Sequence, residues 1–157
     1  MHGNDLAFVR QTMGLLEIAG IRTWLFGGWA EELLDLSPPR QHHDVDLLYP
    51  AADFAVADAF LPACQDMSEI TAKHLAHKRA FVRNSIMTEL ILVRPAPGRG
   101  YVTDFGSRLR FRWPDNLLAT RADGLRVASA EALRSYRAQH GLIRAAISAG
   151  PLTSQLP

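Results

Sequence analysis

The sequence predicts an α/β or α+β fold, a mixed β-sheet with helices packed on it, in which residues 1–150 form a single domain. Three observations support this prediction. Short apolar runs bounded by glycine, proline or asparagine are typical of strands. Stretches with apolar residues at helical spacing stand between them. Helices come early and hairpins later, which is the order of a mixed sheet. Residues 151–157 are expected to form a frayed tail.

The first half of the chain is predicted to hold three helices and three strands. Asn4 or Asp5 is placed to cap the first helix, and Gly20 follows its end. Ser37-Pro38-Pro39 ends the second helix and opens a loop. The predicted helices span residues 5–19, 29–36 and 51–61, and the predicted strands span residues 21–26, 44–49 and 68–71.

The second half is predicted to be rich in hairpins. A tight turn at Asn84-Ser85 joins strands 80–83 and 86–93, and two further short strands span residues 101–105 and 109–113. A helical turn is expected at residues 114–119. Ser129 is expected to begin a last helix that runs to residue 149 and ends at Gly150-Pro151.

Composition limits the class of protein. The chain has 157 residues, 48% hydrophobic and 21% charged, as in soluble globular proteins. Its net charge of +1 does not predict nucleic-acid binding. Cys64 is the only cysteine, which indicates a reducing compartment. No apolar run is long enough for a membrane span, and the first residues do not resemble a secretion signal. We therefore expect a cytoplasmic protein without membrane contact.

Two carboxylates occupy the start of the strand predicted at residues 44–49. Alternate residues of a strand share one face, so Asp44 and Asp46 should point the same way, about 7 Å apart along the backbone. Carboxylates are hard oxygen ligands suited to Mg²⁺, which also binds substrate phosphates. The alternative is a polar strand entrance with solvated acids.

Glu89 is the one acidic residue inside the nearly continuous apolar run of residues 86–93. A carboxylate in such a strand is costly unless it is paired or bound to metal. A neighbouring strand would bring it beside Asp44 and Asp46, giving three acids for a two-metal site. The alternatives are an outward position on a half-exposed strand and a salt bridge to Arg79 or Arg83.

A glycine turn at Gly27-Gly28 follows a predicted strand and precedes a helix. Glycine lets the backbone approach a phosphate closely, although an ordinary turn would look the same. Arg40 lies just before the aspartates, where it can contact phosphate or hold the loop. His42 can orient an aspartate or be a plain loop residue.

Strand, G-G-W-A, short helix and R-x-H-x-D-x-D together resemble the nucleotidyltransferase superfamily of the DNA polymerase beta type. The resemblance is strongest to the small branch of lincosamide and aminoglycoside 2''-nucleotidyltransferases. It covers residues 5–145 and is looser after residue 50; downstream it includes residues 77–81, Trp113-Pro114 and residues 127–131. The positions that carry it are Gly27, Gly28, Trp29, Ala30, Arg40, His42, Asp44 and Asp46.

The resemblance implies transfer of a nucleoside monophosphate, AMP, from a nucleoside triphosphate to a hydroxyl, with pyrophosphate leaving. Two Mg²⁺ ions would be held by Asp44, Asp46 and Glu89, and the glycine turn would offer backbone N–H groups to the triphosphate. Glu89, where many relatives have Asp, would accept the proton, with its pKa raised by burial. The expected nucleotide contacts are Gly27, Gly28, Arg40, His42, Lys78 and Arg79, although Lys78 and Arg79 could instead form a solvated strand face.

The expected acceptor is a small hydroxylated molecule, such as an aminoglycoside or lincosamide antibiotic. Glu31, Glu32 and Asp35 would suit a polycationic acceptor, or form the outer face of an ordinary helix. The alternatives are transfer to a protein or RNA, as in a toxin–antitoxin pair, and a non-catalytic nucleotide-binding relative. Only the basic strand face of Arg108, Arg110 and Arg112 favours the first of these. The sequence leaves open whether the protein forms a homodimer.

Overall fold

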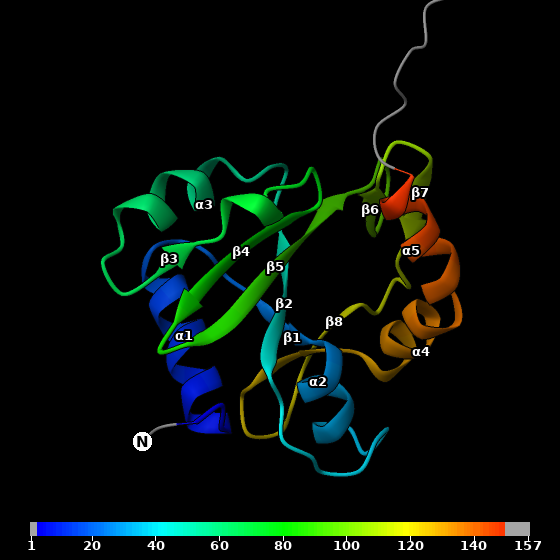
Figure 1. Cartoon of the computed structure of the whole chain (residues 1–157). Coiled ribbons are helices and arrows are strands. Elements are labelled where there is room, and N and C mark those ends of the chain that lie inside the picture. Colours follow the sequence, from blue (N-terminus) through cyan, green and yellow to red (C-terminus); the bar gives the residue numbers. More distant parts are fainter. Residues whose placement is uncertain (1–2, 150–157) are drawn as a thin grey trace, which may run out of the picture.

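The computed structural model describes residues 3–149; helices and strands alternate in the first half, the second half is mostly strands, and two helices come last (Figure 1). The α-helices are α1 (Leu6–Ile18), α2 (Gly27–Leu33), α3 (Ala55–Phe60), α4 (Ala130–Ala138) and α5 (His140–Ser148). Two single 3-10 turns, η1 (Leu61–Ala63) and η2 (Thr71–Lys73), lie between them. The strands are β1 (Trp24–Phe26), β2 (Asp44–Pro50), β3 (Ser68–Glu69), β4 (Lys78–Arg83), β5 (Ile86–Pro95), β6 (Tyr101–Phe105), β7 (Leu109–Arg112), β8 (Leu118–Thr120) and β9 (Arg126–Ala128).

The strands form one mixed sheet in the order β3-β4-β5-β2-β1-β9-β8. β2 is parallel to β5 and β1 is parallel to β9, whereas the other neighbours in this order are antiparallel. The long strand β5 runs beyond the main sheet, where its end pairs with β6, and β6 pairs with β7 (Figure 1). The predicted fold class, a mixed sheet with helices packed on it, is confirmed.

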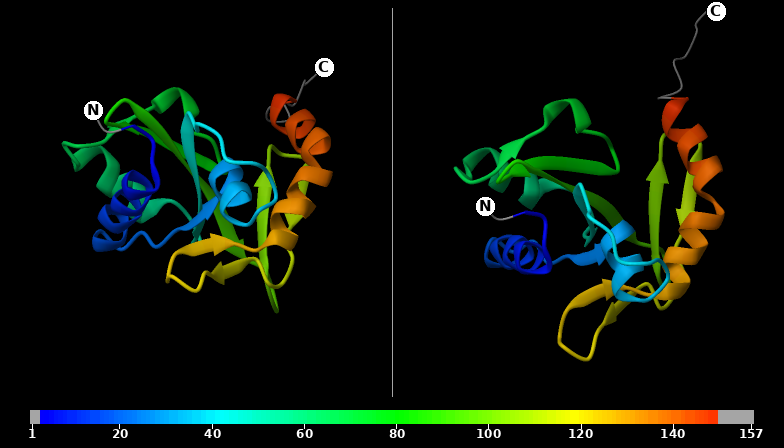
Figure 2. Two further views of the ribbon diagram at one scale, coloured as in Figure 1. Left: turned by 90° about the horizontal axis from the view of Figure 1, so that it is seen from below. Right: turned by 60° about the horizontal axis from the view of Figure 1, so that its bottom comes forward.

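The helices lie on different sides of this framework. One face of β4 meets α1 and α3, because Arg83 bonds Thr12 and Gln11 of α1 and Arg79 bonds Asp58 of α3. Helices α4 and α5 lie beside β6 and β7, at the opposite end of the molecule from α1 (Figure 2). The other face of β4, β5 and β2 therefore looks toward the C-terminal helices.

An aromatic cluster joins α4 to the sheet. The ring of Tyr136 stacks on that of Trp113 with 5.9 Å between centroids, and both rings make edge contacts with Phe26 at the end of β1. The indole N–H of Trp113 is satisfied by the hydroxyl of Thr103 at 2.8 Å. Because aromatic burial and ring contacts both stabilise, this cluster fixes α4 over the end of β1.

Local sequence signals set several boundaries as expected. The Asp5 carboxylate accepts a hydrogen bond from the N–H of Phe8 and caps α1. Asn84 and Ser85 both have positive φ, as a two-residue hairpin turn between β4 and β5 requires. Ser129 caps α4 by accepting from the N–H of Ala132.

Other expectations were wrong. Residues 118–120 form strand β8 where a helical turn was predicted at residues 114–119, and β9 was not predicted. The helix expected at residues 51–61 is confined to α3 and a 3-10 turn. The predicted last helix is broken at Gln139, which ends α4 and precedes α5. Its expected end at Gly150-Pro151, and the tail at residues 151–157, lie outside the described residues. Within residues 3–149, no helix is long and apolar enough to cross a membrane.

Candidate active site

Three carboxylates meet on the face of the sheet that looks toward α4 and α5. Asp44 and Asp46 lie on β2, and the parallel register sets Asp46 directly beside Glu89 of β5. Each of the three offers a ligand oxygen, and these oxygens lie within 4.8 Å of one another. The prediction that a neighbouring strand brings Glu89 beside the aspartates is confirmed. A set of hard oxygen donors at this spacing fits a divalent cation such as Mg²⁺.

A glycine is required at position 27 because the backbone there lies close to the Asp46 side chain. Gly27 has φ +65°, and a Cβ on it would lie 2.3 Å from Oδ2 of Asp46. A side chain here would therefore displace the Asp46 carboxylate. A Cβ on Gly28 would lie 2.4 Å from Nη2 of Arg40, so the guanidinium of Arg40 rests against the turn. Within the described residues, that guanidinium makes no ion pair.

Glu32 of α2 holds the loop that leads into β2. Its Oε1 accepts a hydrogen bond from the N–H of Arg40 at 2.9 Å and lies 3.0 Å from Nε2 of His42. Both bonds lower the pKa of Glu32, the Arg40 N–H being the larger cause. The interpretation that His42 orients an aspartate is therefore corrected: the side-chain partner of its Nε2 is Glu32.

Asn4 ties the N-terminus to the same loop. Its amide donates to the carbonyl oxygens of His42 and Asp44, at 3.2 and 2.9 Å, and its Oδ1 accepts from the indole N–H of Trp29 at 3.1 Å. The Trp29 ring also lies 4.3 Å from the His42 ring. Trp29 thus packs beside the glycine turn. The hydrogen bonds of Asn4 fix the start of β2, the strand that carries Asp44 and Asp46.

Both lysines of the chain bind Glu89. Nζ of Lys78 lies 2.5 Å from Oε2 of Glu89, and Nζ of Lys73 lies 2.9 Å from Oε1. Lys78 was predicted as a site residue, but Lys73 was missed, although Lys73 and Lys78 are the only lysines among 17 basic residues. Glu89 is 7% exposed, so its charge is compensated where it is most costly.

These contacts correct the expected pKa of Glu89. Burial alone would raise its pKa, as predicted, but the hydrogen bonds and charges of Lys78 and Lys73 outweigh burial, and the pKa is lowered. The raised pKa belongs to Asp46, where burial first, and then the charges of Asp44 and Glu89, raise the pKa to about 7. Asp46 is thus the carboxyl most in need of a bound cation near neutral pH.

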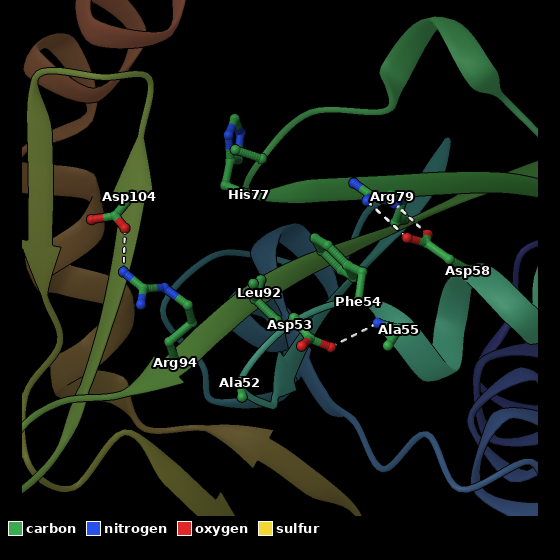
Figure 3. A pocket seen from close by; sticks show the side chains of 11 residues that line it. Ala52, Asp53, Phe54, Ala55, Asp58, His77, Arg79, Leu92, Arg94 and Asp104 are labelled. Carbon is green, nitrogen blue, oxygen red and sulfur yellow. Dashed lines mark hydrogen bonds and ion pairs between the residues drawn. The ribbon is translucent and has the colours of Figure 1, made fainter.

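Arg79 lies away from this site. Adjacent strand residues point to opposite faces, and Arg79 bonds Asp58 of α3 at 2.6 and 3.1 Å (Figure 3). It also donates to the carbonyl oxygen of Leu75 at 2.6 Å, and its guanidinium lies 4.2 Å from the centroid of the Phe54 ring. The prediction that Arg79 contacts the triphosphate is therefore wrong, because its side chain is committed on the far face.

A cavity of about 210 Å³ opens beside the acids. Asp46, Lys78 and Glu89 form one wall, and Tyr136 of α4 and His140 of α5 lie among the residues opposite. Burial, followed by the charges of Asp46 and Glu89, raises the pKa of the Tyr136 hydroxyl. Neither Tyr136 nor His140 was predicted, since their place depends on how the last helices fold back over the sheet.

A mixed sheet with two acids on one strand, a third on the next and a glycine turn touching them is the arrangement that the resemblance to nucleotidyltransferases implies. The family model described as aminoglycoside-2''-adenylyltransferase matches residues 8–79, which contain the glycine turn and both aspartates. This match confirms the resemblance to the antibiotic-modifying branch. No curated protein sequence matches the chain.

Solved structures agree on the fold. The lincomycin-bound lincosamide antibiotic adenylyltransferase LnuA matches with a TM-score of 0.68 at 12% identity, covering 94% of this chain and 96% of that one. ANT(2'')-Ia in complex with adenylyl-2''-tobramycin matches with a TM-score of 0.57 at 16% identity, covering 91% and 94%. At these identities the likeness establishes the fold alone, and substrates must be argued from the site.

Proposed function

We propose that this nucleotidyltransferase moves a nucleoside monophosphate, AMP, from a nucleoside triphosphate to a hydroxyl of a small molecule such as an aminoglycoside or lincosamide antibiotic. The observation that carries the proposal is the meeting of Asp44, Asp46 and Glu89 with ligand oxygens within 4.8 Å. Relatives of the same fold are bound to lincomycin and to an adenylylated tobramycin.

The donor set suits Mg²⁺. Three carboxylates supply hard oxygen ligands, and a cation would favour the ionised form of Asp46, whose pKa is otherwise raised to about 7. Asp44, Asp46 and Glu89 would hold two ions. Bound Mg²⁺ would neutralise charge on the triphosphate, which is the main demand of phosphoryl-type transfer.

The chain's own groups have separate tasks in the transfer. The acceptor oxygen forms a bond to the α-phosphorus, and the bond from that phosphorus to the bridging oxygen of the β-phosphate breaks, so pyrophosphate leaves. The acceptor proton passes to a carboxylate oxygen of Glu89. The lowered pKa of Glu89 keeps it ionised at neutral pH and able to accept this proton.

The nucleotide contacts follow from the turn. Backbone N–H groups at Gly27 and Gly28 and the guanidinium of Arg40, which rests against Gly28, would bind the phosphates. Lys78 would move from Glu89 to the leaving pyrophosphate. His42 would act through the loop that it holds with Glu32.

The basic strand face gives no support to a protein or RNA acceptor. Arg110 bonds Asp104 at 2.8 Å, and Arg112 lies 3.8 Å from Asp115 and donates to the carbonyl oxygen of Arg99. Two of the three arginines therefore have carboxylate partners within the fold, and we favour the small-molecule acceptor.

The test is incubation of the protein with Mg²⁺, each of the four common nucleoside triphosphates and a panel of hydroxylated antibiotics, with mass detection of the adduct. We expect a mass gain of one nucleoside monophosphate, lost in Asp46→Asn and kept in Asp66→Asn, an exposed aspartate that does not line the catalytic cavity. An adduct formed equally well by Asp46→Asn would contradict the proposed chemistry.

A further inference from the structure

We propose that the acceptor reaches the carboxylates through an apolar cavity beside them, that this cavity takes a neutral, largely apolar hydroxylated molecule, and that the buried imidazole of His77 hydrogen-bonds it. The inference rests on the proposed function, because the cavity needs to hold an acceptor only if the protein transfers a nucleoside monophosphate to one. It selects among acceptor classes that the chemistry of the acids leaves open.

Two adjoining cavities define the path. The catalytic cavity of about 210 Å³ and an outer cavity of about 370 Å³ share two lining residues, His77 and Ile147. The outer cavity is bounded by residues 74–77, by the β6–β7 turn at Gly106 and Ser107, and by the end of α5. Its volume lies within the range of small-molecule sites, so an acceptor seated there can extend a hydroxyl past His77 toward Glu89.

The outer cavity lacks the charge that a polycation requires. Among the described residues that line it, none is Asp, Glu, Lys or Arg, and Leu75 presents an apolar side chain that is 40% exposed. Of the three acids expected to suit a polycationic acceptor, Glu31 pairs with Arg137 and Glu32 with His42, and neither these two nor Asp35 lines the outer cavity. An ammonium-rich molecule would lose hydration in the outer cavity without gaining a counter-charge.

His77 is a buried polar group in need of a partner. It is 4% exposed, its ring lies 5.1 Å from the Phe105 ring, and its Nε2 has no hydrogen-bond partner within residues 3–149. Burial first, and then the charge of Lys78, lower its pKa to about 4. The imidazole is therefore neutral at pH 7, and an unpaired buried polar atom is costly. A hydroxyl, which donates and accepts, would satisfy it.

The wall of the outer cavity is set by the backbone. Gly106 has φ +65°, and a Cβ on it would lie 2.4 Å from the carbonyl oxygen of Ala146 in α5. The β6–β7 turn thus packs directly on the helix that carries Ile147. The cavity is pre-formed between these elements, as is usual for ligand sites.

A larger cavity of about 510 Å³ also touches His77 but suits an acceptor less well (Figure 3). Four of its charged side chains are paired with one another, Arg79 with Asp58 and Arg94 with Asp104, and Asp53 accepts a hydrogen bond from the N–H of Ala55. The His77 ring points away from Phe54 and Leu92 in its floor (Figure 3). Asp46 and Glu89 do not line it.

The test measures binding by calorimetry in the presence of Mg²⁺ and a non-hydrolysable triphosphate. The probes are a neutral alkyl glycoside and an aminosugar of similar size with at least three ammonium groups. We expect the wild type to bind the glycoside at least about tenfold more tightly. Leu75→Glu should reduce this preference about tenfold, because a carboxylate near the site attracts cations. Leu75→Gln, of matched size, should leave the preference within about twofold.

The second arm tests His77. His77→Phe keeps the ring contact with Phe105 but removes the polar atoms, and should weaken glycoside binding about fivefold to tenfold, as loss of one hydrogen bond does. His77→Gln, which retains a polar atom near the place of Nε2, should recover part of the loss. Triphosphate affinity should not change in either variant.

The outcomes separate this inference from the proposed function. Failure of the wild type to bind Mg²⁺ and triphosphate would contradict the proposed function. Normal triphosphate binding with no glycoside binding, with equal or tighter binding of the aminosugar, or with equal effects of Leu75→Glu and Leu75→Gln, would overturn the acceptor inference alone.

Discussion

Gly27→Ala tests the closest contact in the site. The substitution adds one methyl group at a residue with φ +65°, and this group would lie 2.3 Å from Oδ2 of Asp46 and 3.1 Å from its Cβ and Cγ. Two effects follow. A left-handed backbone is strained for alanine, and the carboxylate of Asp46 must move away from the position it shares with Asp44 and Glu89.

The magnitude follows from these two effects. A left-handed non-glycine residue costs about 1 kcal/mol or slightly more, and forced repacking of a tight contact costs about 2 kcal/mol. We therefore expect Gly27→Ala to lower the free energy of unfolding by about 3 kcal/mol. In a chain of this length that lowers Tm by about 9 °C. The stabilisation by Mg²⁺ and triphosphate should disappear with the displaced ligand.

Two other glycines provide matched controls. Gly124 has φ +87° with nothing within 4 Å of an added Cβ, so Gly124→Ala should show the backbone strain alone, about 1 kcal/mol. Gly14 lies inside α1 with open space around it, so Gly14→Ala should stabilise by about 0.5–1 kcal/mol. Denaturant unfolding and melting curves with and without Mg²⁺ and triphosphate measure all three. A Gly27→Ala variant that is no less stable than Gly124→Ala and keeps the ligand-induced rise in Tm would show that the contact with Asp46 is not tight.

Three further predictions concern charge. Arg79→Met should lower the free energy of unfolding by about 2 kcal/mol, through loss of the Asp58 pair, yet leave the triphosphate-induced rise in Tm intact; loss of that rise would return Arg79 to the nucleotide site. In metal-free protein, the raised pKa of Asp46 means that its contribution to stability is present below pH 3.8 and lost as pH rises through about 7. Melting curves should therefore show a larger fall in Tm between pH 5 and 8 for the wild type than for Asp46→Asn, and equal falls would contradict this. Lys73→Met should raise the pKa of Glu89 and shift the acid limb of the rate profile to higher pH, with an unchanged limb as the contrary result.

The sequence alone was sufficient to predict the acidic centre. Period-two alternation places Asp44 and Asp46 on one face of β2, and an acid inside an apolar run requires a partner, so Glu89 was assigned correctly to the neighbouring strand. The same alternation could have excluded Arg79. It follows Lys78 directly in β4, so the two side chains cannot both face the triphosphate.

The parts that were missed depend on contacts distant in the sequence. Lys73 lies in a 3-10 turn whose direction no local pattern fixes, yet together with Lys78 it lowers the pKa of Glu89. Strands β8 and β9 have three residues each, and β9 is set by pairing with β1, about a hundred residues earlier. Three residues are too few to show a strand periodicity, and these strands form because tertiary pairing outweighs local propensity.

Binding of Mg²⁺ with a non-hydrolysable triphosphate, measured by calorimetry, tests the metal site itself. We propose that Asp44, Asp46 and Glu89 together hold the metal-bound nucleotide. We expect saturable binding by the wild type and by Asp66→Asn, binding that requires Mg²⁺, and at least about a tenfold loss of affinity in Asp46→Asn with the fold retained. Equal affinity in Asp46→Asn, or equal affinity without Mg²⁺, would contradict it.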